Sequence, residues 1–126
     1  MTNSAAPNPF GGYLAEILRA EGLNSFATAE LTTLTPVELS SASLVILAEM
    51  PLSAEQATVI SDYVASGGRL IAMRPDARLS PALGITLVGG SLDRPYLAID
   101  TTSGSGEGFT AATLPIKGAA DLYTLE

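Results

Sequence analysis

Three charged side chains follow two apolar runs of the sequence, and their types and spacing could do chemistry. Glu49 comes directly after the apolar residues 44–48. Arg74 and Asp76 come after a second apolar run, residues 70–73. If both runs are strands of an open α/β sheet, these side chains lie at its carboxyl edge, where such sheets bind ligands. Arg74 could hold an anionic group there, while Glu49 or Asp76 binds hydroxyl groups or acts as a base.

The same three residues also have a structural interpretation. Arg74 could pair with either carboxylate and thereby join two loops, and Asp76 could cap the helix that follows it. We favour this interpretation, because ion-pair networks also gather at the ends of strands. The candidate ligand site nevertheless consists of these three residues.

The residue types that are absent exclude more chemistry than the charged residues suggest. The chain contains no cysteine and no histidine. It therefore has no thiol nucleophile, no thiolate metal site and no Ser–His–Asp triad. It also lacks the usual general base near neutral pH. The carboxylates are scattered without the spacing of a calcium loop. We expect no catalysis, no metal site and no cofactor.

Residues 104–108, Gly-Ser-Gly-Glu-Gly, superficially resemble a phosphate-binding loop. They do not follow a clear strand, and no Gly-Lys-Ser/Thr sequence occurs among them. Glu107 also places a negative charge where a phosphate would have to lie. We therefore interpret this segment as a flexible loop.

The charge of the chain argues against nucleic acid as a partner. Six basic residues face 13 acidic ones, so the net charge is −7 and repels phosphate groups. Only 15% of the residues are charged and 47% are apolar. That composition fits a domain that lies against neighbours in a larger protein, and a bias toward Ala, Ser and Thr accounts for it equally well.

No apolar run approaches the roughly 18 to 20 residues of a membrane span. The first seven residues lack the basic and apolar regions of a signal peptide. We therefore expect no membrane contact, and the sequence does not indicate an oligomeric state or a compartment.

Helical and strand patterns alternate along the chain and must position the charged residues. The sequence predicts helices over residues 9–21, 36–41, 54–66 and 77–83 and strands over residues 23–27, 44–48, 70–73, 85–88, 96–100 and 114–117. Such alternation predicts a three-layer, flavodoxin-like α/β domain with a mainly parallel sheet and helices on both faces. A domain of this kind normally begins with a central strand, and residues 1–7 make a poor one. We expect that first strand to be missing from this sequence.

Local signals fix several helix ends. Thr35 with Glu38 and Ser53 with Gln56 match capping boxes. Asn8 is predicted to cap the first helix, with Pro9 as its first residue. Asp76 is predicted to cap the last helix, and Gly84 to close it.

The two central apolar runs should pair as adjacent parallel strands, joined by the helix over residues 54–66. We expect Ile46, Ile60, Val64 and Ile71 to be almost fully buried. Truncating Ile46 or Ile71 to alanine should then cost about 2 to 5 kcal/mol.

Four stretches carry a family resemblance: Asn8-Pro9-Phe10-Gly11, residues 16–23 (EILRAEGL), residues 67–76 (GGRLIAMRPD) and residues 117–123 (KGAADLY). Together they resemble the class I glutamine amidotransferase-like superfamily, whose members have a flavodoxin-like α/β fold. The closer similarity is to its non-catalytic branch near the trehalose-utilisation-like and β-galactosidase middle domains. The last stretch is similar to the Gly-Ala-Asp-x-Tyr close of that branch.

Catalytic members of that superfamily carry a cysteine on the turn after a central strand and a histidine near the end of the domain. Here the turn is Arg74-Pro75, and the carboxyl-terminal region has Lys117. The resemblance therefore implies a domain that is not an enzyme. It also implies that the chain is one module of a large bacterial protein, exported to the cell surface or secreted, with carbohydrate-related neighbours.

The expected organisation is one domain over residues 8–124. Residues 1–7 should be a disordered leading segment, and residues 125–126 resemble a cloning remnant. The function that we expect is that of a structural or interaction module whose partners are neighbouring domains. The alternative is a module that binds a small ligand or a sugar through Glu49, Arg74 and Asp76.

Overall fold

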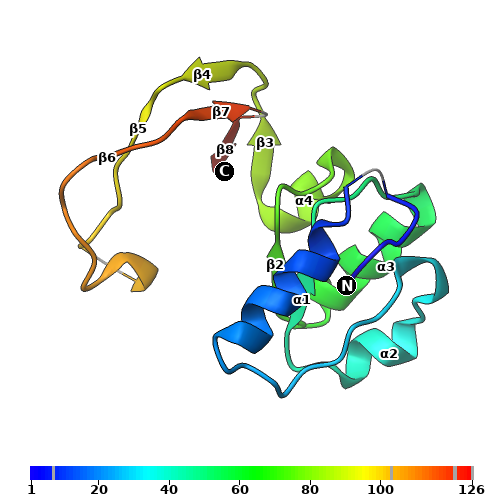
Figure 1. The fold of residues 1–126 in the computed structure, drawn as a ribbon. Coiled ribbons are helices and arrows are strands. Elements are labelled where there is room, and N and C mark those ends of the chain that lie inside the picture. The colour runs from blue at the N-terminus through cyan, green and yellow to red at the C-terminus, as the bar shows by residue number, and fades with distance from the viewer. Residues whose placement is uncertain (7, 103, 121, 126) are drawn as a thin grey trace. The chain divides into compact units, whose positions relative to one another are not determined.

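The chain forms two compact units in a computed structural model that describes residues 1–6, 8–102, 104–120 and 122–125. Unit 1 is Met1–Gly84 and unit 2 is Ile85–Glu126. The helices are α1 (Phe10–Ala20), α2 (Pro36–Ser41), α3 (Ala54–Ala65) and α4 (Ser80–Leu83), with the 3-10 turns η1 (Leu31–Thr33), η2 (Ala77–Leu79) and η3 (Gly104–Gly106). The fold is mixed α/β (Figure 1).

The centre of unit 1 is a pair of parallel strands. Strand β1 (Val45–Leu47) pairs with β2 (Leu70–Ala72), and α3 connects them. A backbone hydrogen bond of 2.8 Å from the N–H of Met73 to the carbonyl oxygen of Leu47 extends the pair beyond β2. The predicted adjacency and direction of these two strands are confirmed.

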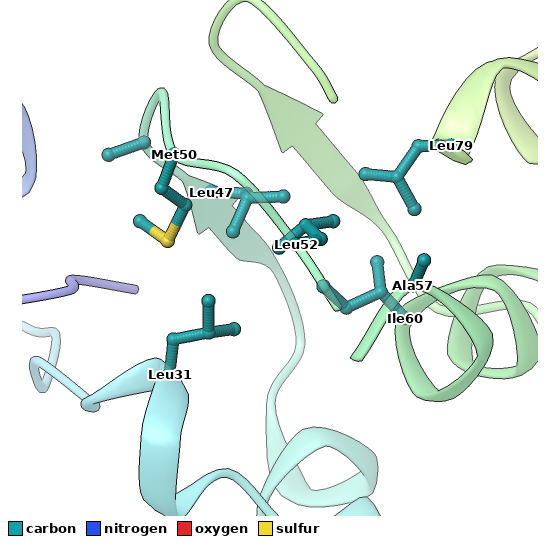
Figure 2. Packing of buried hydrophobic residues seen from close by; sticks show 8 residues of the cluster. Leu31, Leu47, Met50, Leu52, Ala57, Ile60 and Leu79 are labelled. Atoms are coloured by element: carbon teal, nitrogen blue, oxygen red, sulfur yellow. The ribbon is translucent and has the colours of Figure 1, made fainter. Parts of the chain in front are cut away.

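The core of unit 1 lies between this strand pair, the loop that follows β1, and the helical segments. Figure 2 shows leucines and an isoleucine of these elements converging on one another. Ile60 and Leu79 have no exposed surface, and Leu31 and Leu47 are 2% exposed. Burying each such side chain contributes about 1.5 to 3 kcal/mol, which holds α3, η1 and η2 against the strand pair.

Of the four isoleucine and valine side chains expected in the core, only Ile60 is fully buried. Ile46 and Val64 are only partly buried and Ile71 is 46% exposed, so the prediction of almost full burial is wrong for these three residues. Side chains alternate between the two faces of a strand, and Leu70 and Ala72 take the face of β2 that packs on the core. Ile71 therefore points to the other face.

The predicted caps are largely confirmed. Thr35 with Glu38 and Ser53 with Gln56 form complete capping boxes at α2 and α3. The carboxylate of Asp76 caps η2, which leads directly into α4. Gly84 ends α4 with a φ of 62°, a left-handed conformation that glycine adopts without a Cβ penalty.

Two expectations about the first third of the chain are wrong. Helix α1 begins at Phe10 with Pro9 as its N-cap, and no side chain caps it, so Asn8 does not. Residues 23–27 form no strand. Leu23 is 60% exposed, and the ring of Phe26 packs under the guanidinium of Arg19 at 5.1 Å, so this segment buries too little apolar surface to form a strand of the sheet.

The residues that precede α1 are hydrogen-bonded to the rest of unit 1, where the sequence predicted a loose segment. Thr2 forms a parallel β-bridge with Glu30, through bonds of 2.9 Å to the carbonyl of Ala29 and 2.8 Å from the N–H of Leu31. The amino group of Met1 donates to the carbonyl oxygen of Ile46 at 2.6 Å. Residues 1 and 2 therefore lie between Glu30 and β1.

Unit 2 is built from antiparallel pairs. The outgoing strands β3 (Ile85–Leu87), β4 (Ser91–Asp93) and β5 (Tyr96–Leu97) pair with the returning strands β8 (Tyr123–Leu125), β7 (Gly118–Ala120) and β6 (Leu114–Pro115). The strands predicted near residues 85, 96 and 114 thus exist, but they do not extend the parallel pair. Parallel sheets need both faces covered, and most side chains of these strands are exposed.

Of the mainly parallel sheet that the sequence predicts, the described residues show one two-stranded parallel pair. No helix in the described part of the chain is long and apolar enough to cross a membrane.

Candidate functional site

Glu49 and Arg74 meet at the carboxyl ends of β1 and β2. Arg74 Nη1 lies 2.9 Å from Glu49 Oε1, in a salt bridge that joins the loops leaving the two strands. The two side chains are 54% and 34% exposed. The predicted convergence is therefore seen for these two residues, in the form that the structural interpretation expected.

The backbone of Arg74 is unusual, because its φ is 45°. A residue with a Cβ in this left-handed region costs roughly 1 to 2 kcal/mol compared with glycine. The surrounding contacts, including the salt bridge to Glu49, must hold Arg74 in this conformation.

Asp76 does not join the Glu49–Arg74 pair in the contacts that the structure records. Its carboxylate accepts hydrogen bonds from the N–H of Leu52 at 3.0 Å and from the N–H of Arg78 at 2.9 Å. The guanidinium of Arg78 also pairs with it at 3.2 Å. Only 10% of this side chain is exposed. Asp76 therefore ties the loop after β1 to the loop after β2.

The hydrogen bonds to Asp76 also lower the pKa of its carboxyl group. Burial by itself raises the pKa of this carboxyl. The N–H groups of Arg78 and Leu52 and the guanidinium of Arg78 outweigh that effect, so the pKa lies below its usual range. The carboxylate is thus stabilised in its charged form as a structural acceptor. A lowered pKa makes it a weak general base, because an efficient base has a pKa near the working pH.

A cavity of about 710 Å³ lies at the opposite end of the two strands. Ser43 precedes β1 and Arg69 directly precedes β2, so this cavity is at the amino edge of the pair. Its lining comes from α2, the end of α3 and these two segments: Pro36, Leu39, Ser40, Ala42, Ser43, Val59, Asp62, Tyr63, Ser66, Gly67, Gly68 and Arg69.

Tyr63 forms a fixed wall of this cavity. A Cβ on Gly68 would overlap the Tyr63 ring, so the ring lies directly against the backbone at Gly68. The Tyr63 hydroxyl is within hydrogen-bond distance of the carbonyl oxygens of Ala42 at 3.3 Å and Arg69 at 3.2 Å. The absence of a side chain at Gly68 is what allows this packing.

Sequence reasoning missed Arg78 as the partner of Asp76, and Tyr63 and Arg69 as cavity residues. Arg78 could have been found, because a capping aspartate accepts from the backbone two residues later and brings that side chain near. Tyr63 was assigned to the apolar stripe of α3, and no local pattern signalled that its hydroxyl reaches two other segments.

In the residues that the structure describes, no three acidic, cysteine or histidine side chains gather as a metal site. Comparison with protein-family models, curated proteins and solved structures finds no match to this chain.

Proposed function

We propose that the chain is a non-catalytic interaction module of a larger bacterial protein and that unit 1 packs against a neighbouring domain. The observation that carries this proposal is the apolar face of α1, defined by Phe10, Tyr13 and Ile17. These side chains are 50%, 55% and 58% exposed. Their spacing of three and four residues places them on one face of the helix. Contiguous exposed apolar side chains of this kind are typical of protein interaction surfaces.

We further propose that unit 1 has the strand order of a flavodoxin-like sheet. That order is 2-1-3-4-5, with the first strand between the second and third. Residues 1 and 2 hydrogen-bond to residues 29–31 on one side and to Ile46 of β1 on the other, and β2 follows β1. This succession supports the three-layer, mainly parallel fold that the sequence suggested.

The absence of catalysis is supported by the residue types of the chain. Without cysteine or histidine, no thioester or imidazole chemistry is available. Arg74 and Lys117 occupy the regions where catalytic members of the resembled superfamily carry those residues. The net charge of −7 supports a protein partner over nucleic acid. The carbohydrate-related, exported setting of the parent protein rests on the resemblance alone.

Hydrogen exchange tests the interaction proposal. Amide exchange of α1 is measured in this chain by itself and in the full-length product of its gene. We expect slower exchange of α1 in the full-length protein, and we expect Ile17→Ser to abolish that difference with only a small loss of stability in the isolated chain, because Ile17 is 58% exposed. Helix α3 serves as the control, because its buried face packs within unit 1. Equal exchange of α1 in both proteins would contradict the proposal.

The second candidate function is a module that binds a small ligand or a sugar at Glu49, Arg74 and Asp76. The positive φ of Arg74 favours it, because strained backbone clusters at ligand sites. The occupied carboxylate of Asp76 weighs against it.

A further inference from the structure

The cavity at the amino edge of β1 and β2 is lined by two opposite charges that do not pair with each other. Asp62 lies in the last turn of α3, and Arg69 follows the turn that ends this helix. Both side chains are exposed, and neither makes a hydrogen bond or ion pair with any other described residue. An anion and a cation are therefore available on the walls of one cavity.

The position of Asp62 adds negative charge at the carbonyl end of α3. The carbonyl end of a helix carries a partial negative charge, which basic residues usually offset. The last turn of α3 has no basic residue and instead carries the Asp62 carboxylate. A positively charged group of a ligand would be stabilised there by both the carboxylate and the helix end.

The remaining walls suit a small polar molecule with a short apolar portion. Ser43 and Ser66 line the cavity, and their hydroxyls make no hydrogen bond to another described residue. The hydroxyl of Ser40, a third lining serine, donates to the carbonyl oxygen of Val37 at 2.9 Å. Leu39 and Val59 are apolar lining residues. The volume of about 710 Å³ is within the range of roughly 300 to 1,000 Å³ found for small-molecule sites. Tyr63, fixed against Gly68, keeps one wall in place.

We propose that this cavity binds a short peptide that has free amino and carboxyl termini. The peptide's ammonium group pairs with Asp62, and its carboxylate accepts hydrogen bonds from the Arg69 guanidinium. The hydroxyls of Ser43 and Ser66 bond to the peptide backbone. This inference is independent of the interaction surface on α1, which involves none of these residues.

Titration of the whole chain with trialanine, followed by amide NMR spectra, tests the proposal. We expect shifts concentrated at Ser43, Asp62, Ser66 and Arg69, with saturation approached by about 10 mM if the dissociation constant is near 1 mM. N-acetyl trialanine and trialanine amide each lack one terminal charge. Because exposed ion pairs contribute up to about 1 kcal/mol, each should bind about two- to fivefold more weakly.

Two variants assign each terminus to its partner. Asp62→Asn should weaken trialanine binding and make it insensitive to acetylation, while amidation still weakens it. Arg69→Gln should give the reverse pattern. Glu16→Gln and Lys117→Gln change the net charge by the same amounts outside the cavity and should leave binding unchanged.

Three results would overturn the proposal. The first is the absence of localised shifts at about 10 mM peptide, where millimolar binding would be visible. The second is equal binding of the blocked and free peptides. The third is binding of a neutral sugar such as glucose at the same amides with no effect of Asp62→Asn or Arg69→Gln, which would identify the cavity as a site that does not use its charges.

Discussion

Tyr63 and Arg69 are joined by a hydrogen bond of 3.2 Å, from the phenol hydroxyl to the backbone carbonyl oxygen. The same hydroxyl lies 3.3 Å from the carbonyl oxygen of Ala42. A single side chain of α3 thereby reaches both the residue before β2 and the segment before β1.

Replacing Tyr63 by phenylalanine should lower the free energy of unfolding by about 0.5 to 1.5 kcal/mol, because the one hydroxyl donor that the two carbonyl oxygens share is lost while the ring packing is kept. Urea denaturation measures this change. Tyr13→Phe is the matched control, since Tyr13 is 55% exposed on α1, and we expect it to be neutral. Equal effects of the two variants would mean that the Tyr63 hydroxyl bonds only to water.

Adding a methyl group at Gly68 should destabilise unit 1. The Cβ of Gly68→Ala overlaps the Tyr63 ring, so the ring must move and break its hydroxyl contacts, at a cost of about 1 to 3 kcal/mol. Gly12→Ala is the opposite case, because a Cβ there meets nothing within 4 Å inside α1. That variant should gain about 0.5 to 1 kcal/mol from helix propensity. Thermal unfolding of both variants provides the comparison, and a stabilised Gly68→Ala would disprove the packing.

The backbone of Arg74 offers a way to separate strain from charge. Arg74→Ala removes the exposed salt bridge to Glu49 and should cost under about 1 kcal/mol. Arg74→Gly removes the same side chain but relieves the positive φ, so it should be more stable than Arg74→Ala by about 1 kcal/mol.

The same Arg74 variants test the ligand-binding alternative. In a thermal-shift screen of sugars and small carboxylates, we expect no compound to stabilise the wild-type chain selectively over Arg74→Ala. A compound that does so would favour the second candidate function over the structural role of the Glu49–Arg74 pair.

The contribution of the Asp76 carboxylate to the free energy of unfolding should depend on pH. Because its pKa is lowered on folding, its contribution is fully present above the unfolded value of about 3.9 and is lost as the pH falls through the lower folded value. Asp76→Asn should cost about 0.5 to 2 kcal/mol at neutral pH, as for other lost caps, and the gap to wild type should narrow below about pH 4. Urea midpoints from pH 7 to pH 3 measure this gap.

Ile60 in the core and Ile71 on the outer face of β2 should respond differently to truncation. Ile60→Ala should cost about 2 to 5 kcal/mol, because Ile60 has no exposed surface. Ile71→Ala should cost well under half of that, since nearly half of Ile71 is exposed. Equal losses would show that something covers the outer face of β2.

Sequence patterns predicted the parts of this fold that depend on local chemistry. The capping boxes at Thr35 and Ser53 and the left-handed Gly84 each involve residues within one helical turn, so the sequence carries the whole signal. The apolar runs likewise identified β1 and β2. The burial of Ile71 was overestimated because an apolar run does not say whether both faces of a strand are covered.

The hydrogen bonds between segments far apart in the sequence could not be predicted from the sequence. Glu30, for example, accepts hydrogen bonds from the backbone N–H of Ser4 at 2.7 Å and from the Thr2 hydroxyl at 3.1 Å. Nothing in the residues around Glu30 signals those partners. At the candidate site, residue types correctly indicated an ion pair, yet they did not indicate that Asp76 would bond to Leu52 and Arg78.

The nested pairing of unit 2 has a consequence for the order in which it folds. Strands β5 and β6 close the shortest loop, and β4–β7 and then β3–β8 enclose it. The entropic cost of closing a loop rises with its length, so the β5–β6 pair has the lowest cost of formation. Once it has formed, the effective loop that β4 and β7 must close is shorter, and the same holds next for β3 and β8. The pairs of unit 2 should therefore form in the order β5–β6, β4–β7 and β3–β8. Lengthening the loop after Leu97 should slow the formation of all three pairs, although none of their contacts is changed.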